Sequence, residues 1–398
     1  MNVLVVNCGS SSIKYQVVNM LDESVLAVGL ADRVGIPGST LEHKPEGKEK
    51  VVFNQDLSDH TAGMKMVLDV LVNPEYGCIK NMDEIGAVGH RVVHGGETYA
   101  KSVIINDEVK RVIRECFDVA PLHNPPNLMG IEACMELMPK VNHVAVFDTA
   151  FHQTMSPANF MYAVPYDTYE KFRVRRYGFH GTSHYYVSHQ AAEMLGKPYE
   201  ECKIITLHLG NGASMAAIKD GKVVDTSMGF TPLEGLVMGT RSGDIDPAIV
   251  FYLMDKLNMN SAEANNYFNK KGGMLGLSGV SNDLRDIEQA AEGGNKQAQL
   301  ALDVYYNKIK GYIGNYIAKL NGCDCIVFTA GVGENGISMR KNICENLDYL
   351  GISMDTEKNN VRGKQVDVSS PGSKVRIFII PTNEELVIAR DTYSFSKK

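Results

Sequence analysis

The stretch VNCGSSSIKY occupies residues 6–15 and follows a short apolar run at the start of the chain. The alternating residues after it predict a second strand, so residues 2–18 are expected to form a strand, a polar loop and another strand. A tight hairpin needs only two turn residues. The loop from Gly9 to Ser12 is richer than that in small residues, hydroxyls and N–H groups, and Lys14 follows it. This composition predicts phosphate binding, and the alternative is a loose hairpin with an exposed lysine.

A second copy of this pattern occurs in the other half of the chain. The stretch IITLHLGNGAS, residues 204–214, also reads as a strand that runs into a glycine-containing loop and another strand. At a constant offset, Asn7 aligns with His208 and Gly9 aligns with Gly210. One repeat over half the chain indicates two domains of related topology, although so short a similarity could also arise by chance. Two such hairpins could bind a polyphosphate from both sides.

Composition narrows the class of protein. The chain has 398 residues, of which 44% are hydrophobic and 22% charged, with a net charge of −7. This size favours two domains, and the charge argues against a nucleic-acid partner. The eight cysteines show no paired spacing, which favours free thiols in a reducing compartment. No signal peptide is evident, and no segment has the ~20 apolar residues of a membrane span, so we expect a cytoplasmic protein without a membrane partner.

A third strand is predicted at residues 325–330, after a long helical pattern over residues 301–320. The glycine loop Gly331–Gly336 follows it, and helical spacing then continues to Gly351, a candidate C-cap. This order predicts a layered α/β architecture. The loop also matches G-x-G-x-x-G, so nicotinamide binding must be considered, but too little chain remains to complete a dinucleotide domain.

Charged residues in unusual settings mark the candidate site. Arg91 and Arg241 both lie in glycine-rich stretches, which suit an exposed guanidinium that binds a carboxylate or phosphate, and a surface ion pair is the alternative. Asp148 ends an apolar strand-like run, where it could face a ligand or cap a helix. His180 lies between glycines in a shaped loop. Glu384 is expected to begin the last helix, over residues 384–391.

One further segment is predicted to be irregular. Residues 35–50 are charged and interrupted by glycine and proline, which predicts an exposed loop. We see no low-complexity linker between the halves, so the two domains are expected to pack closely.

Together these motifs resemble the acetate kinases, which form the acetokinase family. The similarity covers essentially the whole chain in order, without a departure at a motif position, and it rests on NCGSSSIK (7–14), GHRVVHGG (89–96), FDTAFH (147–152), RYGFHG (176–181), HLGNG (208–212), MGTRSGD (238–244) and GVGEN (331–335). The related propionate kinases share most of them.

The resemblance implies a fold of two duplicated actin-like ATPase (ribonuclease H-like) α/β domains with a nucleotide cleft between them. The expected N-terminal domain comprises residues 1–150 plus 385–398 and carries the acetate side and the first phosphate hairpin. The expected C-terminal domain comprises residues 151–384 and carries the nucleotide site and a dimer interface. A homodimer is therefore the expected assembly.

The resemblance also implies site residues. Arg91 binds the acetate carboxylate, and Val93, Leu122, Phe179 and Pro232 form the methyl pocket. Arg241 and His180 stabilise the transferring phosphoryl group, and Asn7 and Glu384 associate with Mg²⁺, for which Mn²⁺ is an alternative. The ATP-binding residues implied in this way are Lys14, His208, Leu209, Gly210, Asn211, Gly212, Asp283, Leu284, Arg285, Gly331, Val332, Gly333, Glu334 and Asn335.

The expected reaction is reversible transfer of the γ-phosphoryl group of ATP to acetate, giving ADP and acetyl phosphate, a step of acetyl-CoA biosynthesis. Such a transfer depends on positioning and on charge stabilisation along an in-line path. Acetate is already ionised at pH 7, so Asp148 is not needed as a base. It is instead expected to belong to the catalytic set by orienting the metal or a water, or by holding Arg91 or Arg241.

Other functions stay open at this stage. Propionate or another short-chain acid could be the acceptor, since one methylene in an apolar pocket changes binding by only ~1–3 kcal/mol. More distant alternatives are a nicotinamide-dependent oxidoreductase and an actin-like ATPase that binds a partner protein.

Overall fold

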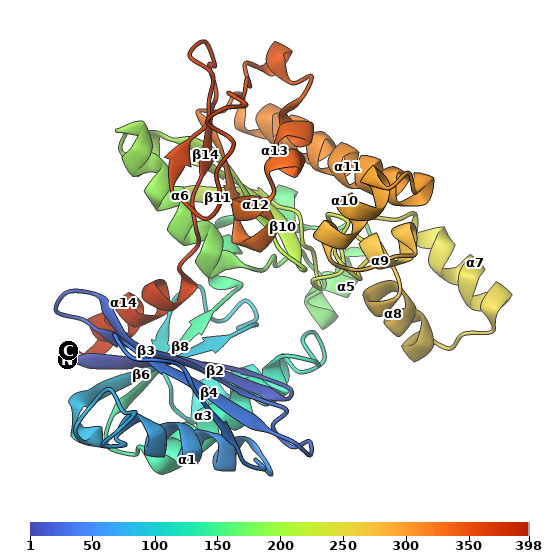
Figure 1. Ribbon diagram of the computed structural model, residues 1–398. Coiled ribbons are helices and arrows are strands. Elements are labelled where there is room, and N and C mark those ends of the chain that lie inside the picture. Colours follow the sequence, from blue (N-terminus) through green and yellow to red (C-terminus); the bar gives the residue numbers. More distant parts are fainter. Residues whose placement is uncertain (397–398) are drawn as a thin grey trace. The chain divides into compact units, whose positions relative to one another are not determined.

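The structure is a computed structural model that describes residues 1–396. The chain forms two compact units, which are treated separately below. Unit 1 is Met1–Phe151 with the chain from Asn383 onward, and unit 2 is His152–Thr382. Each unit contains one β-sheet with helices packed on it (Figure 1). Within the described part of the chain, no helix is both long enough and apolar enough to span a bilayer.

Unit 1 contains an eight-stranded sheet with the order β5-β4-β3-β2-β1-β6-β8-β7. The strands are β1 (Asn2–Gly9), β2 (Ser12–Asn19), β3 (Ser24–Asp32), β4 (Thr40–Pro45), β5 (Val51–Asn54), β6 (Ile85–Val92), β7 (Val103–Ile104) and β8 (Asn142–Phe147). The helices are α1 (His60–Leu71), α2 (Asp107–Glu115), α3 (Asn124–Leu137) and α14 (Glu384–Ser396). Short 3₁₀ turns lie at Met82–Glu84 and, at the end of the unit, Ala150–Thr154.

The strand–loop–strand prediction for residues 2–18 is confirmed, but the predicted long loop is wrong. Gly9 pairs with Ser12 in the antiparallel β1–β2 ladder, so Ser10 and Ser11 alone form the turn. Two of the four small residues that suggested a loop, Gly9 and Ser12, are therefore strand residues.

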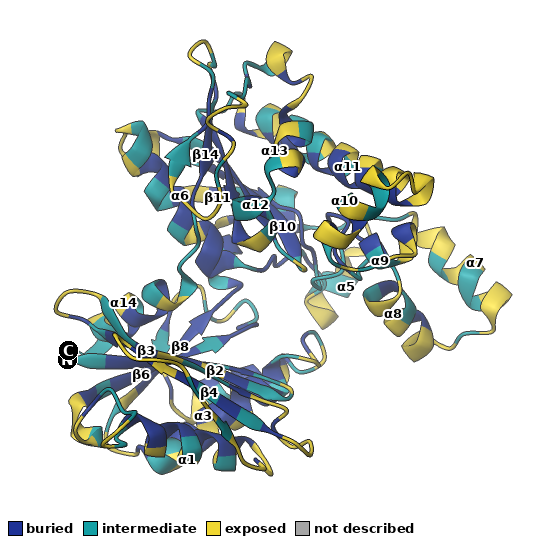
Figure 2. Cartoon of the chain, in the orientation of Figure 1, coloured by how far each residue is buried: buried dark blue, intermediate teal, exposed yellow. Residues whose placement is uncertain are grey.

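The two faces of the unit 1 sheet bury different cores. One face packs against α1 and α3 through residues such as Leu4, Val6 and Met64. The other face packs against α14 through Val3, Val5, Val144, Val146 and Ile388. The central strands β1, β6 and β8 are largely buried, whereas β3, β5 and β7 are mostly accessible (Figure 2).

A glycine allows α14 to lie this close to the sheet. A β-carbon on Gly89 in β6 would lie 2.3 Å from Oγ1 of Thr392 and 2.7 Å from Cγ2 of Ile388. Both distances are shorter than any real contact of a β-carbon, so a larger residue here would push the helix away.

Strand alternation then places the polar residues of the site on the α14 face. Side chains two apart along a strand share a face. Asn7 and Asp148 follow Val5 and Val146 at this spacing, and Arg91 follows Gly89. Val6 is the register partner of His90 in the parallel β1–β6 ladder, so Asn7 and Arg91 come next on neighbouring strands.

The expectation of an exposed loop over residues 35–50 is wrong for its middle. Thr40–Pro45 forms β4, and Leu41 and His43 are completely buried. Nδ1 of His43 forms a hydrogen bond with the hydroxyl of Tyr15 at 2.7 Å. Nε2 of His43 forms another with the carbonyl oxygen of Tyr76 at 3.0 Å. The polar composition hid a strand whose buried histidine is fully hydrogen-bonded.

Unit 2 contains a six-stranded sheet with the order β11-β10-β9-β12-β14-β13. The strands are β9 (Lys203–Leu209), β10 (Ala213–Lys219), β11 (Lys222–Thr226), β12 (Cys325–Thr329), β13 (Val366–Asp367) and β14 (Arg376–Ile379). The helices are α4 (Pro157–Phe160), α5 (Tyr166–Phe172), α6 (Gly181–Leu195), α7 (Pro247–Leu257), α8 (Ser261–Lys270), α9 (Gly273–Ser278), α10 (Leu284–Glu292), α11 (Lys296–Leu320), α12 (Ala330–Asn335) and α13 (Ile337–Cys344), with 3₁₀ turns at Tyr199–Glu201 and Asp348–Leu350.

The two sheets repeat one topology. The order β3-β2-β1-β6-β8 of unit 1 recurs as β11-β10-β9-β12-β14 in unit 2. In both, the first three strands are antiparallel neighbours and the last two run parallel to the central strand. This repetition confirms the predicted duplicated α/β fold. It also differs from the all-parallel order of a dinucleotide-binding domain.

The helices around the third predicted strand differ in detail from the prediction. The long helix before β12 is confirmed as α11. The glycine segment 331–335 is not a loop but most of the short helix α12, which ends at Gly336. The following helix, α13, ends at Cys344, and Gly351 instead closes a separate 3₁₀ turn with φ of 80°. Asn346, with φ of 62°, breaks the helical pattern between them.

Candidate active site

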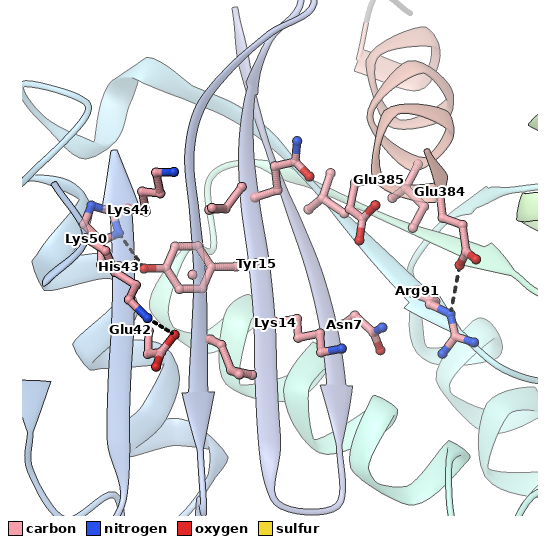
Figure 3. A pocket seen from close by; sticks show the side chains of 16 residues that line it. Asn7, Lys14, Tyr15, Glu42, His43, Lys44, Lys50, Arg91, Glu384 and Glu385 are labelled. Atoms are coloured by element: carbon pink, nitrogen blue, oxygen red, sulfur yellow. Dashed lines mark hydrogen bonds and ion pairs between the residues drawn. The ribbon is translucent and has the colours of Figure 1, made fainter. Parts of the chain in front are cut away.

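The polar centre of unit 1 is an arginine between two carboxylates. Nη2 of Arg91 is in direct ion-pair contact with Oδ2 of Asp148. Nε of Arg91 lies 3.9 Å from Oε2 of Glu384, the pair that Figure 3 shows. The Asp148 side chain is 1% exposed, against 19% for Arg91 and 21% for Glu384. The buried aspartate therefore fixes the guanidinium, and part of the arginine stays accessible.

Electrostatics in this centre are strongly perturbed. Burial opposes the charge of Arg91, but the carboxylates of Asp148 and Glu384 more than offset it and raise the pKa of Arg91 above its ordinary value. Burial, together with the nearby Asp148 carboxylate, raises the pKa of Glu384 to about 7. Two acidic groups so close together favour the arrival of a cation.

A cavity of about 310 Å³ adjoins Arg91 in unit 1. Asn7, Lys14, Arg91, Glu384 and Glu385 line it together with side chains of β2, β3 and β4. Figure 3 shows Lys14, Asn7 and Arg91 next to one another on adjacent strands, with Glu384 at the start of α14. Lys14 thus lies beside the Arg91 centre and not in the cavity that holds most of the other residues predicted to bind ATP.

The residues predicted to associate with Mg²⁺ can be tested against this geometry. Asn7 and Glu384 both line the Arg91 cavity and offer oxygen ligands, which Mg²⁺ prefers. Among residues 1–396, no group of three or more His, Cys, Asp or Glu side chains could hold a metal by itself. An ion that keeps several waters and binds substrate phosphates needs only one or two protein carboxylates, so the residues fit Mg²⁺.

The four residues predicted for the methyl pocket do not line the Arg91 cavity. In unit 1, Val93 is 3% exposed and its N–H donates to Oδ1 of Asn127, whereas Leu122 is 60% exposed. In unit 2, Phe179 is buried, and the carbonyl of Pro232 accepts a hydrogen bond from Arg241. The methyl pocket therefore stays a prediction.

In unit 2, Arg241 and His180 meet at the turn between β9 and β10. A β-carbon on Gly212 would lie 3.6 Å from Nη1 of Arg241 and 3.6 Å from Nε2 of His180. His180 has a left-handed backbone (φ 54°) immediately before α6, and its ring stacks on His208 with a centroid distance of 4.1 Å. Glycine at position 212 leaves room for a ligand between the two side chains.

Arg241 differs from Arg91 in having no acidic neighbour. Its Nη1 donates to the Pro232 carbonyl at 3.2 Å, and among the described residues no carboxylate lies within ion-pair distance of it. Burial lowers the pKa of Arg241 below its ordinary value. A desolvated guanidinium without a counter-charge is a strong indication of an anion site.

A second cavity in unit 2 has a volume of about 830 Å³. Eight of the predicted ATP-binding residues line it, namely Gly210, Asn211, Asp283, Leu284, Arg285, Gly331, Val332 and Asn335. The other five predicted unit 2 residues lie just outside it: His208 and Leu209 end β9, Gly212 follows in the turn, and Gly333 and Glu334 belong to α12. Three separate segments of the chain therefore converge on one cavity.

Sequence reasoning missed several residues of this cavity. Glu288, Gln289 and Glu292 continue the face of α10 that begins at Arg285, with the spacing of three and four expected for one side of a helix. That spacing could have identified them. Burial and the Glu292 charge raise the pKa of Glu288. Arg362, Tyr305, Gly239, Met274, Asn282, Gly336, Ile337 and Ser338 also line the cavity, and no local pattern marks them.

Comparisons with known proteins identify the family to which the chain is similar. A family model described as the acetokinase family matches residues 2–390. The chain is 81% identical to an acetate kinase of Syntrophomonas wolfei, with all of both chains covered. Among solved structures, it is similar to an acetate kinase of Porphyromonas gingivalis (50% identity, 99% of each chain, TM-score 0.95). It also resembles a propionate kinase of Francisella tularensis (42% identity, 99% of each chain, TM-score 0.92).

Proposed function

Because the chain belongs to the acetokinase family, we propose that it transfers the γ-phosphoryl group of Mg·ATP to acetate, giving acetyl phosphate and ADP in a reversible reaction. The observation that carries this proposal is Arg241, a half-buried guanidinium beside His180 with no carboxylate partner in the described chain. Such a group suits the charge that develops on a phosphoryl group during transfer.

Arg91 supplies the site for the acceptor. Asp148 orients its guanidinium from the buried side, and the accessible part can bind a carboxylate. A carboxylate with an ordinary pKa near 4 is ionised at neutral pH. No group therefore has to remove a proton from acetate, and Asp148 acts by holding Arg91 in place.

Asn7 and Glu384 are the residues that would hold Mg²⁺. When bound, the ion neutralises charge on the phosphate oxygens of the nucleotide. Asp148 adds to the negative potential at this point without needing to bind the ion. Lys14, in the same cavity, adds a positive charge that can interact with the phosphates.

The cavity of unit 2 is the proposed nucleotide site. Gly210 and Asn211 offer backbone groups of the β9–β10 turn, and Gly331, Val332 and Asn335 of the neighbouring α12 also line the cavity. His180 and Arg241 then contact the transferring phosphoryl group, and the remaining predicted ATP residues border the cavity.

The chain is further proposed to act as a homodimer in the cytoplasm. Helix α7 has no buried residue although it is largely apolar, and Ile249, Phe251, Tyr252 and Leu257 are exposed (Figure 2). Contiguous exposed apolar surface of this kind marks interfaces. All eight cysteines are free in the structure, which suits a reducing compartment.

Trapping of the product tests the proposed reaction. The purified chain with Mg·ATP and acetate should form acetyl hydroxamate in the presence of hydroxylamine, with less product from propionate and little from butyrate or formate. A larger product yield from propionate would identify a propionate kinase, the activity named for the Francisella relative. No acyl phosphate from any of the four acids would overturn the proposal.

A further inference from the structure

A buried serine in unit 2 connects two imidazole rings. Oγ of Ser214 lies 2.8 Å from Nδ1 of His180 and 2.8 Å from Nε2 of His184. The other ring nitrogen of His184, Nδ1, lies 2.7 Å from Oγ1 of Thr206. Ser214, His184 and Thr206 are all 0% exposed. These contacts form one continuous chain of hydrogen bonds that ends at His180.

The fold brings these groups together in a simple way. Thr206 and His208 are two residues apart on β9 and share a face of the sheet. Ser214 is the register partner of His208 on β10, so its side chain lies on the same face. Helix α6 contacts this part of the sheet, and its first turn contributes His184, one turn after His180.

Counting hydrogens restricts this chain to a few states. Burial, reinforced by His152 and His208, lowers the pKa of His184 well below its ordinary value, so the ring carries only one hydrogen. The Ser214 hydroxyl also has only one hydrogen to give, although it faces two ring nitrogens. If the hydroxyl hydrogen is used within this chain, the hydrogen bonds all point toward His180 or all point away from it; if it is not, both rings donate to the serine oxygen and Nδ1 of His180 carries a hydrogen.

Only one direction leaves His180 able to donate to an anion. If Thr206 donates to His184, His184 to Ser214 and Ser214 to Nδ1 of His180, a neutral His180 carries its hydrogen on Nε2. Nε2 is the atom that lies with Arg241 around Gly212. In the opposite direction Nδ1 carries the hydrogen, and the lone pair of Nε2 would face the anion.

We propose that Ser214 and His184 are positioning residues that hold neutral His180 in the tautomer with hydrogen on Nε2. This proposal rests on the role given above to His180 in binding the transferring phosphoryl group. Neither residue touches the reacting atoms; both act through the imidazole. The charged or titratable groups of unit 2 that face His180 include His184, the stacked His208 and Arg241.

Ser214→Ala tests the role of the hydroxyl. We expect kcat to fall about ten- to a hundred-fold, as when an outer hydrogen-bond partner of a functional imidazole is removed. The KM values for acetate and ATP should change less than threefold. Ser214→Thr keeps a hydroxyl in a strand and should recover part of the lost kcat.

Ser188→Ala is the matched control. Ser188 is also 0% exposed, lies on α6, and bonds to the Tyr185 carbonyl and Tyr199 hydroxyl, away from His180. It should keep normal kcat. Equal losses of kcat in Ser188→Ala and Ser214→Ala, or in the alanine and threonine variants at 214, would show that packing matters and not the hydroxyl, and would overturn the proposal.

Nitrogen-15 spectra of the full chain labelled at histidine give a readout that does not depend on activity. With inorganic phosphate added, the His180 signals, identified by their loss in His180→Gln, should show hydrogen on Nε2 only, and Ser214→Ala should mix the two tautomers. Hydrogen on Nδ1, or on both nitrogens, in the unaltered protein would overturn the proposal. Failure of hydroxamate formation alone would instead count against the proposed reaction.

Discussion

Asp148 contacts Arg91 from the buried side of the unit 1 sheet, whereas Arg241 of unit 2 meets no carboxylate in the described chain. The two arginines therefore differ in what holds them. Arg91 is oriented by an acidic partner, whereas Nη1 of Arg241 donates to the carbonyl of Pro232 and to the sulfur of Met238. Their substitutions should consequently have different effects.

Asp148→Asn should uncouple Arg91 from its anchor. The amide keeps the shape but not the charge, so kcat/KM for acetate should fall roughly 10–100-fold. Thermal unfolding should also show a loss of roughly 1–3 kcal/mol from the broken buried pair. Glu23→Gln is a suitable control, because the exposed Glu23–Arg390 pair should contribute at most about 1 kcal/mol. Near-normal turnover of Asp148→Asn would remove Asp148 from the catalytic set.

Arg241→Leu should lower kcat by about a thousand-fold or more, as expected for an arginine that stabilises a phosphoryl transition state. Stability should not fall, because the substitution removes a half-buried charge without a counter-charge. Steady-state kinetics and a melting curve check both statements. A raised KM for acetate with normal kcat would contradict the role given to Arg241.

Arg340 of unit 2 differs from Arg241 because the protein itself satisfies its hydrogen bonds. It is 0% exposed and donates to the side chain and carbonyl of Asn359 and to the carbonyls of Gly333 and Val361. Arg340→Leu should leave these acceptors unpaired and lower the melting temperature markedly. Stability measurements on both variants would thus separate a structural arginine from a ligand-binding one.

Glu384→Gln should weaken Mg²⁺ binding. We expect the Mg²⁺ concentration for half-maximal activity to rise about tenfold or more. Mg²⁺ alone should raise the melting temperature of the unaltered protein but not that of the variant. Glu23→Gln, an exposed carboxylate of unit 1 that does not line the cavity, is the control. An unchanged Mg²⁺ requirement would exclude Glu384 as a ligand.

Buried histidines predict a loss of stability in acid. Burial lowers the pKa of His152 to about 4, from an ordinary value of 6.5. Since the unfolded chain takes up this proton first, the contribution of His152 is present above pH 6.5 and is lost progressively as the pH falls from 6.5 to about 4, by up to about 3 kcal/mol. His152→Gln keeps a donor for the Phe179 carbonyl and should show a weaker decline of melting temperature over this range. Melting temperatures that decline equally with falling pH in the two proteins would contradict this account.

Phe251→Asp should prevent dimer formation. Phe251 is 68% exposed on α7, and a carboxylate there could not be buried against a second copy. Light scattering after size-exclusion chromatography should report a dimer for the unaltered protein and a monomer for the variant. Asp255→Asn on the same helix is a polar control. A dimeric Phe251→Asp would move the interface elsewhere.

Much of the fold could be predicted from sequence because strong apolar periodicity marks β1, β2, β9, β12 and α11. Strand β4 was missed because its buried positions include His43 and Pro45, which read as polar loop residues. The length of the β1–β2 turn was misjudged for a related reason: Gly9 and Ser12 pair within the ladder although their composition suggests a loop.

The site was predictable only in part. Arg91, Asp148 and Glu384 were identified one by one, but their contact depends on strand register and on the return of α14 to unit 1. Ser214 and His184 carry no local signal, because each acts through the neighbour to which it hydrogen-bonds. Contacts of this kind arise only when separate elements pack.

The close packing of α14 on Gly89 has a consequence for synthesis of the chain on the ribosome. The strands that α14 covers are made early, and the whole segment from His152 to Thr382 must be translated before the helix emerges. Until then, Val3, Val5, Val144 and Val146 lack their partner, and Arg91 has no Glu384 beside it. Folding of the first unit therefore cannot finish before the second unit has been synthesised. Until α14 emerges, the nascent polypeptide exposes an apolar sheet face of the kind that chaperones bind.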